Sequence, residues 1–242
     1  MAKAIASLLA ASAAVISLVL GACQTPPPDP TPAAYTYDYT QPVPDGDLLG
    51  DEWFDDSAII GHSLMEGFEG FAKVYSNIHY FTSTGLSAAG ASSYSKFDLP
   101  NGGTGTLRQG LNQKQFSKIY IMLGVNEISS SKENYKKNMT AILDVVRETQ
   151  GEDIPIYILN VTPTTRKKSD STAFNLKNVT KMNEAISELC AEQECYLVDV
   201  YSCFADEDGY LPSDISTDGV HITASQYRIM ANYMLSHTVE EP

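Results

Sequence analysis

Ser63 stands where a short apolar run ends and a helical pattern begins. Residues 58–60 are apolar enough for a buried strand that stops at Gly61, and an amphipathic pattern follows from Leu64. A serine at a strand-to-helix turn lies beside the positive end of the helix dipole, which suits a nucleophile. Serine also caps helices routinely, so this stretch alone leaves both roles open.

A nucleophilic serine needs a base for its proton and a carboxylate that orients the base. The chain has four histidines: His62, His79, His221 and His237. His62 is a poor base for Ser63, because neighbouring side chains in an extended turn diverge. His221 is the better candidate, since Asp218 stands three residues before it and Gly219 between them allows a tight turn. Alone, this Asp-x-x-His pattern also fits an ordinary turn.

Charge that develops on a substrate oxygen needs hydrogen-bond donors aimed at it. Asn126 follows an apolar run that ends at Gly124, and its amide is a candidate donor. Gly85 follows a weaker strand pattern and offers a backbone N–H, with Gly90 as its competitor. A loop asparagine that satisfies local backbone and an ordinary turn glycine are the alternatives.

The elements that must position these residues alternate along the chain. Strands are expected at 58–60, 77–82, 118–123, 154–161 and 195–200. Helices are expected at 64–71, 135–149, 179–189 and 227–234. Strands that are apolar on both faces and alternate with helices predict an α/β fold with a mainly parallel sheet covered on both sides. Ser63, residues 124–127 and a loop at 162–170 all follow strands, at the edge where such sheets bind ligands.

Serine near the start of the domain, then Gly85, then Gly-x-Asn, then Asp-x-x-His closely resembles the SGNH (GDSL-type) hydrolase family over residues 55–236. The resemblance implies a three-layer α/β/α sandwich of flavodoxin-like character and no metal or organic cofactor. It implies Ser63 as nucleophile, His221 as base and Asp218 as its orienting carboxylate. The oxyanion hole would comprise Ser63, Gly85 and Asn126.

Two positions depart from the family pattern. His62 stands where the family usually has the aspartate of Gly-Asp-Ser-Leu, and Glu127 replaces a usual aspartate. Neither residue is a member of the triad, so the chemistry is expected to survive.

The N-terminus resembles a bacterial lipoprotein signal peptide, because an apolar run and small residues precede Cys23. The resemblance implies removal of residues 1–22 and lipid attachment to Cys23, which would anchor the protein to the membrane on the extracytoplasmic side. An uncleaved anchor helix or an ordinary secretory signal are alternatives. Residues 23–47 are rich in Pro and Thr and predict a tether, so the hydrolase domain is expected at residues 48–242.

The composition and charge of the chain limit the classes of partner that it can be expected to bind. The chain has 242 residues, 43% of them hydrophobic, and a net charge of −14. No basic stripe is available for phosphates, so nucleic acid is not expected as a partner. An exported protein can form disulfides, but Cys190, Cys195 and Cys203 are expected to be free thiols because the nearest pair joins a helix to a strand.

The first functional hypothesis is an exported serine esterase that acts on short acyl esters, such as acetyl groups on carbohydrate at the cell surface. A lipase or lysophospholipase is the alternative within the class, and a catalytically dead glycan-binding lipoprotein is the alternative outside it. The basic run 166–168 is expected on a loop at the site, either solvated or in contact with an anionic substrate.

Overall fold

The structure is a computed structural model that describes residues 37–239. A five-stranded parallel sheet in the order β2-β1-β5-β6-β7 lies at its centre. The strands are β1 (Ser57–Gly61), β2 (His79–Thr82), β5 (Lys118–Met122), β6 (Ile156–Leu159) and β7 (Tyr196–Val198). The strand order is that of flavodoxin-like folds, and it confirms the predicted α/β sheet.

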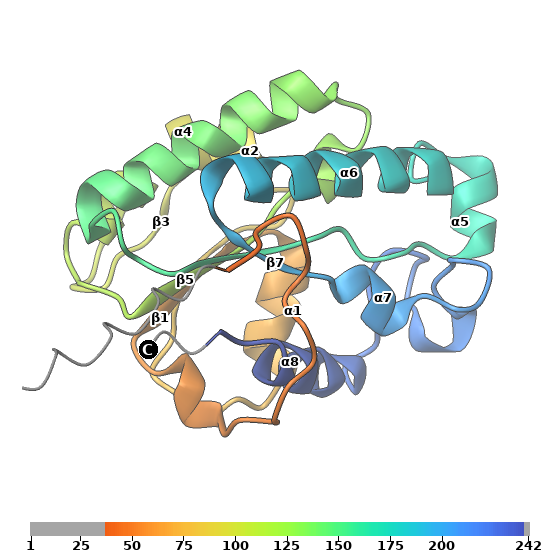
Figure 1. The fold of residues 1–242 in the computed structure, drawn as a ribbon, viewed down its shortest axis with the longest axis horizontal. Helices are drawn as coiled ribbons and strands as arrows, with labels where there is room; N and C mark the ends of the chain where they lie inside the picture. The colour runs from red at the N-terminus through yellow and green to blue at the C-terminus, as the bar shows by residue number, and fades with distance from the viewer. Residues whose placement is uncertain (1–36, 240–242) are drawn as a thin grey trace, which may run out of the picture. The chain divides into compact units, whose positions relative to one another are not determined.

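Helices cover both faces of this sheet and complete three layers (Figure 1). One face carries α2 (Ala88–Ser93), α3 (Leu107–Leu111), α4 (Lys132–Gln150) and α6 (Leu176–Gln193). The other face carries α1 (Ser63–Phe71), α7 (Val200–Phe204) and α8 (Gln226–Ser236). Side chains of β1 alternate between the two cores, with Ile60 in the first and Ile59 in the second. Both faces of the strand are therefore buried, as parallel sheets require.

Several short elements were not expected. A hairpin of β3 (Phe97–Asp98) and β4 (Thr104–Gly105) and three single-turn 3-10 helices lie in the loops. The predicted loop 162–170 is partly wrong, because Arg166–Ser171 form the helix α5. Its formation has a local cause: the side chain of Thr165 accepts a hydrogen bond from the N–H of Lys168 and so caps the helix.

The packed part begins by Tyr37, earlier than the boundary expected at residue 48. The N–H of Val43 donates to the carbonyl of Leu197 at 2.8 Å, and Pro42 forms a parallel bridge with the same residue. Val43 is only 2% exposed, and Tyr39 packs beside Tyr196. The later part of the expected tether therefore covers the free edge of β7, which unprotected strands need.

The remaining N-terminal predictions, the signal peptide, Cys23 and the start of the tether, lie outside the described residues. Within residues 37–239, no helix has both the length and the apolar character needed to cross a bilayer. Cys190, Cys195 and Cys203 are free thiols, as expected.

Candidate active site

Ser63 is the first residue of α1, directly beyond the carboxyl end of β1. The turn depends on Gly61, because a Cβ there would come within 2.3 Å of Cγ of Met65. That close approach brings the helix tightly onto the strand. The Ser63 side chain consequently lies at the edge of the sheet, beside the neighbouring strand β5, where the strand order reverses.

A chain of hydrogen bonds joins Ser63 to two residues distant in the sequence. Ser63 Oγ lies 2.7 Å from Nε2 of His221. The other ring nitrogen, Nδ1, lies 2.9 Å from Oδ2 of Asp218. These distances are those of strong hydrogen bonds, and the order of the groups is the order that nucleophilic serine catalysis requires.

The turn between Asp218 and His221 is held in place by its own backbone. Oδ1 of Asp218 accepts hydrogen bonds from the N–H groups of Val220, at 2.9 Å, and His221, at 2.8 Å. Desolvation opposes the charge, yet the hydrogen bonds from His221 and Val220 lower the pKa of the Asp218 carboxyl to about 2. Gly219 has φ +93°, a left-handed conformation that favours glycine. Asp218 therefore remains an anion wherever an imidazole titrates.

His62 is fully buried and acts as the N-cap of α1. Its Nδ1 accepts a hydrogen bond of 3.3 Å from the N–H of Leu64, a capping interaction that an aspartate carboxylate commonly makes. Burial, and then the charge of nearby His221, lower the pKa of His62 to about 3. The ring is therefore neutral, with its proton on Nε2. These contacts explain how a histidine can occupy the usual aspartate position, and they agree with its exclusion as the base.

Asn126 lies in the 3-10 helix η2 (Val125–Glu127), just beyond β5. Its Nδ2 donates to the carbonyl of Leu86 at 3.0 Å. Glu127 Oε2 accepts from the N–H of Ala88 at 2.7 Å, so two hydrogen bonds tie this turn to the loop after β2. An amide nitrogen carries two hydrogens, and the second can donate to a substrate oxygen.

Gly85 lies in the turn between β2 and α2, with φ +76°. It does not line the pocket that contains Ser63, although its neighbour Leu86 is the hydrogen-bond partner of Asn126. Its role as an oxyanion donor therefore remains a prediction. Gly90, the competitor, lies within α2.

Ser63, Asn126, Asp218 and His221 line one pocket of about 120 Å³. Its remaining lining residues are His62, Leu64, Val125, Lys168, Phe174 and Val220. Phe174 comes from the segment between α5 and α6, and sequence analysis missed it because an aromatic residue in an irregular segment carries no distinguishing pattern. The other two histidines, His79 and His237, lie elsewhere and bond backbone carbonyls of Asp98 and Tyr233.

The family model of the GDSL-like Lipase/Acylhydrolase family matches residues 59–229, and the chain belongs to this family. It is an ester hydrolase of the GDSL type, as the resemblance in its sequence indicated. No curated protein matches the chain significantly.

Solved structures of the same type resemble this fold. An acetyl xylan esterase is 13% identical with a TM-score of 0.58, over 76% of this chain and 100% of that chain. A GDSL-like lipase from Bacteroides thetaiotaomicron is 14% identical with a TM-score of 0.57, over 74% of this chain and 84% of that one. A member of the lipolytic protein G-D-S-L family from Veillonella parvula is 16% identical with a TM-score of 0.53, over 74% of this chain and 95% of that chain. At these identities the likeness concerns the fold alone.

Proposed function

We propose that Ser63 is the nucleophile of a serine esterase, with His221 as its base and Asp218 as the carboxylate that orients the base. The observation that carries this proposal is the hydrogen-bonded chain of 2.7 Å and 2.9 Å from Ser63 Oγ through the imidazole to Asp218. His221 Nε2 takes the hydroxyl proton as Ser63 Oγ attacks the ester carbonyl. The tetrahedral intermediate expels the alcohol, which leaves with that proton. Water then hydrolyses the acyl-enzyme by the same steps.

The oxyanion of the intermediate needs donors beside Ser63. The backbone N–H of Ser63 lies at the N-terminus of α1, where the helix dipole favours negative charge. The second amide hydrogen of Asn126 is the next candidate, because Asn126 lines the same pocket. Gly85 N–H is the third donor that the family resemblance implies.

The acyl group we propose is short, with acetyl as the leading case, and the alcohol is a carbohydrate. A pocket of about 120 Å³ suits a small acyl group, since pockets for larger ligands begin at about 300 Å³. An open groove beside Asn126 and Phe174 favours the alternative of a longer acyl chain, because Val125 and Ile128 give it apolar walls.

We also propose that the enzyme works outside the cytoplasm, held to the membrane by lipid on Cys23. The support is the sequence before Cys23, which has the apolar run and small residues of a lipoprotein signal. The Cys23→Ala variant is expected to leave the membrane fraction when the full chain is expressed in a bacterium. Retention of that variant in the membrane would contradict the anchor.

The experiment that tests the catalytic proposal combines labelling with turnover. A fluorophosphonate probe is expected to label the wild type and to leave Ser63→Ala unlabelled. Nitrophenyl esters of increasing chain length and an acetylated polysaccharide are then compared on both proteins. Equal labelling of Ser63→Ala would overturn the role of Ser63. Faster turnover of long-chain esters than of acetate would replace the short-acyl proposal by the long-acyl alternative.

A further inference from the structure

A second cavity, of about 380 Å³, adjoins the catalytic pocket on the side of the Asp218 turn. Lys168 and Asp218 line both cavities. The other residues that line the second cavity are Thr165, Lys167, Ser171, Ser213, Ser216, Thr217 and Gly219. We call this cavity the lysine subsite. Its lining combines two lysines with several hydroxyl-bearing residues, in contrast to the partly apolar groove at Phe174.

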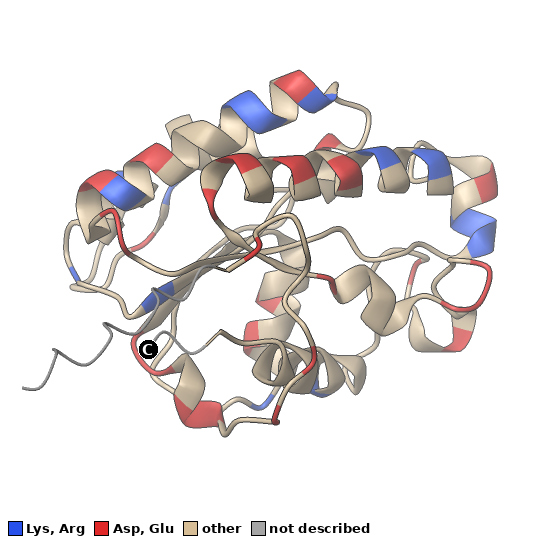
Figure 2. Cartoon of the chain, in the orientation of Figure 1, with Lys and Arg blue, Asp and Glu red and all other residues tan. Residues whose placement is uncertain are grey.

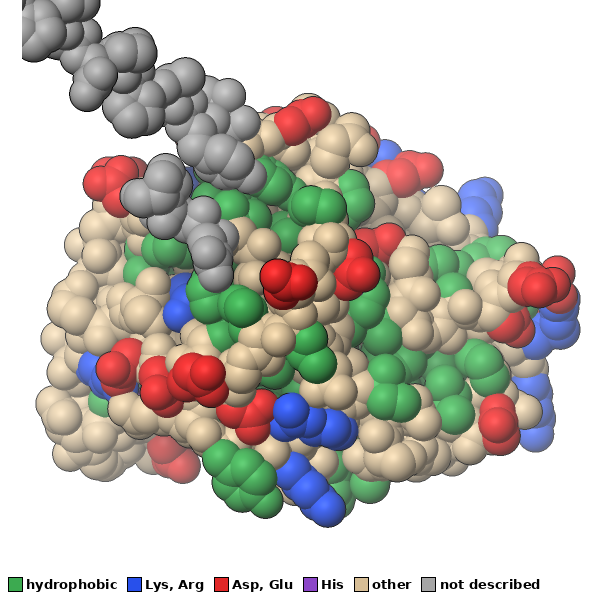
Figure 3. All heavy atoms as spheres, turned by 60° about the horizontal axis from the view of Figure 1, so that its bottom comes forward, with side chains coloured by type: hydrophobic (Ala, Val, Ile, Leu, Met, Phe, Trp, Pro, Cys, Tyr) green, Lys and Arg blue, Asp and Glu red, His purple; other side chains and the backbone are tan. Residues whose placement is uncertain are grey.

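Several basic side chains of the described residues form ion pairs, such as Lys132 with Glu184 and Arg228 with Asp51. Lys167 and Lys168 form no ion pair within residues 37–239, and Lys168 Nζ lies 5.4 Å from the ring centroid of Phe174. Figure 2 shows Lys and Arg positions on α5 and at the start of α6, at the right-hand end of the molecule, and Figure 3 shows basic and acidic side chains side by side at that end.

Two contacts hold α5 against the catalytic turn. The N–H of Thr165 donates to the carbonyl of Gly219 at 2.9 Å. A Cβ on Gly219 would come within 2.8 Å of both Cβ of Lys168 and Oγ1 of Thr165, so the stem of Lys168 packs directly on this turn. On the outer side, Arg166 pairs with Asp208 and stacks over Tyr210. These contacts fix the stem of Lys168 beside the turn that carries Asp218 and His221.

Asp218 contributes a negative charge to the same wall, but its carboxylate is already engaged. Oδ1 accepts from Val220 and His221, and Oδ2 faces the His221 ring. In the proposed mechanism His221 returns its proton to the leaving alcohol, so the alcohol departs on the imidazole side. The lysine subsite continues from that side.

We propose that the lysine subsite binds an anionic group, a carboxylate or a phosphate, carried by the alcohol part of the ester substrate. This inference rests on the proposed function and narrows it to acyl esters of acidic, polyhydroxylated molecules. The ammonium groups of Lys167 and Lys168 attract the anion, and the hydroxyls of Ser171, Ser213 and Thr217 offer partners for substrate hydroxyls.

A binding experiment tests the subsite without relying on turnover. The Ser63→Ala protein is titrated with glucuronate, glucose 6-phosphate and glucose, and binding is followed by NMR. At least one anion is expected to bind about fivefold more tightly than glucose, the upper range for a partly exposed ion pair. The favoured anion distinguishes a carboxylate from a phosphate substrate.

The same titration with K167Q/K168Q in the Ser63→Ala background is expected to abolish the preference for the anion. Lys137, exposed on α4, provides the matched control: K137Q removes the same charge elsewhere and is expected to retain the preference. The preference should also weaken in 0.5 M salt. Equal binding of glucose and both anions, or a preference that survives in K167Q/K168Q, would overturn the proposal.

Turnover separates this inference from the esterase proposal. The ratio of kcat/KM for 4-acetoxybenzoate to that for phenyl acetate is expected to fall about fivefold in K167Q/K168Q and to stay constant in K137Q. If the wild type hydrolyses neither ester, the esterase proposal fails while the binding experiment still decides the subsite. If phenyl acetate is hydrolysed and the ratio does not change in K167Q/K168Q, the lysine subsite is wrong and the esterase proposal stands.

Discussion

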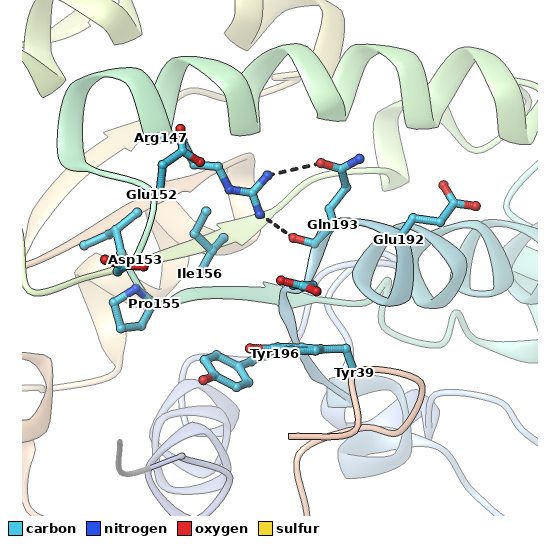
Figure 4. A pocket seen from close by; sticks show the side chains of 11 residues that line it. Tyr39, Arg147, Glu152, Asp153, Pro155, Ile156, Glu192, Gln193 and Tyr196 are labelled. Carbon is cyan, nitrogen blue, oxygen red and sulfur yellow. Dashed lines mark hydrogen bonds between the residues drawn. The ribbon is translucent and has the colours of Figure 1, made fainter. Parts of the chain in front are cut away.

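The two ends of the central sheet each carry a cavity, and the larger one lacks the catalytic groups. At the amino ends of β6 and β7, a cavity of about 550 Å³ is lined by Tyr39, Arg147, Tyr196 and four carboxylate side chains (Figure 4). At the carboxyl ends of β1 and β5, the pocket with Ser63 measures only about 120 Å³. Cavity size alone would therefore select the wrong end of the molecule.

The difference between these ends lies in what their polar groups contact. At the larger cavity, Arg147 donates to the side-chain and backbone oxygens of Gln193, and it thereby joins α4 to the C-terminal end of α6. At the smaller pocket, the hydrogen bonds lead from Asp218 to a hydroxyl that faces the cavity. A catalytic site is thus marked by a connected series of groups that ends at a reactive atom. Four substitutions test this contrast.

The largest effect is expected from Asp218→Asn at the catalytic end. An asparagine cannot hold the imidazolium that forms in the transition state, so kcat/KM should fall by about 10³- to 10⁴-fold. Steady-state hydrolysis of phenyl acetate measures the change. Asp214→Asn, the same change at an exposed position four residues earlier, is the matched control and should leave kcat/KM unaltered. A loss of less than tenfold in Asp218→Asn would remove Asp218 from the triad.

The grouping of the candidate catalytic residues was predictable because their chemistry restricts the residue types and the fold restricts their order. Ser63, Asn126 and Asp218 each follow a distinct pattern, and the structure brings all three to one pocket with His221. Long apolar patterns predicted the main elements equally well: the expected strand 118–123 is β5, Lys118–Met122. Long buried segments contribute most of the apolar burial that stabilises the fold, so their apolar residues recur with the period of a helix or a strand and can be recognised in the sequence.

Short elements were missed because they span too few residues to show a periodic pattern, and in α5 a tertiary contact adds to the local cap by Thr165. α5 has six residues and depends on the hydrogen bond between Thr165 and Gly219. The packing of residues 37–47 on the sheet was missed for a related reason. The Pro-rich composition predicts an extended tether, but it does not reveal that the N–H of Val43 donates to Leu197 in the edge strand β7. Phe174 matters only through its position, which no local pattern encodes.

The second prediction concerns the close packing at the catalytic end. In Gly219→Ala the new Cβ would lie 2.8 Å from Cβ of Lys168, so the turn that carries Asp218 and His221 must move. A displacement of that kind should lower kcat/KM by about 100-fold.

Gly151→Ala is the control for this effect. Gly151 has φ +105°, yet a Cβ there meets nothing within 4 Å. The control thus shares the backbone strain, about 1 kcal/mol, without the collision. Thermal unfolding should show destabilisation in both variants, larger in Gly219→Ala because of the collision, whereas only Gly219→Ala should lose activity. Equal activity in the two variants would show that the packing of α5 on the catalytic turn is unimportant.

The third prediction uses the buried ring at the catalytic end. His62 stays neutral in the folded protein down to about pH 3, while an unfolded histidine binds a proton near pH 6.5. As the pH falls below 6.5, the unfolded state gains protons that the folded state does not, so stability decreases. The free energy of unfolding should fall by about 1.5 kcal/mol from this residue between pH 6.5 and 5.

Urea unfolding across this pH range measures that slope in the wild type and in His62→Asn. Asparagine is a good N-cap and does not titrate. The slope of the unfolding free energy against pH should therefore decrease by the contribution of about one proton. The comparison uses the slope because the smaller side chain also lowers stability at every pH. Parallel slopes in the two proteins would show that His62 is not held neutral by burial.

The smallest effect is expected at the opposite end of the sheet, from Arg147→Met. The substitution removes the hydrogen bonds to Gln193 but leaves every group of the catalytic pocket in place. The free energy of unfolding should fall by about 1 kcal/mol, from two hydrogen bonds of a partly exposed guanidinium at about 0.5 kcal/mol each, and kcat/KM should remain within about twofold of the wild type. Lys137→Met, at an exposed position on the same helix α4, controls for loss of a positive charge and should change neither quantity. If Arg147→Met lowered kcat/KM as strongly as Gly219→Ala, the large cavity would have to be part of the site, and the division of the molecule into a catalytic end and a structural end would be wrong.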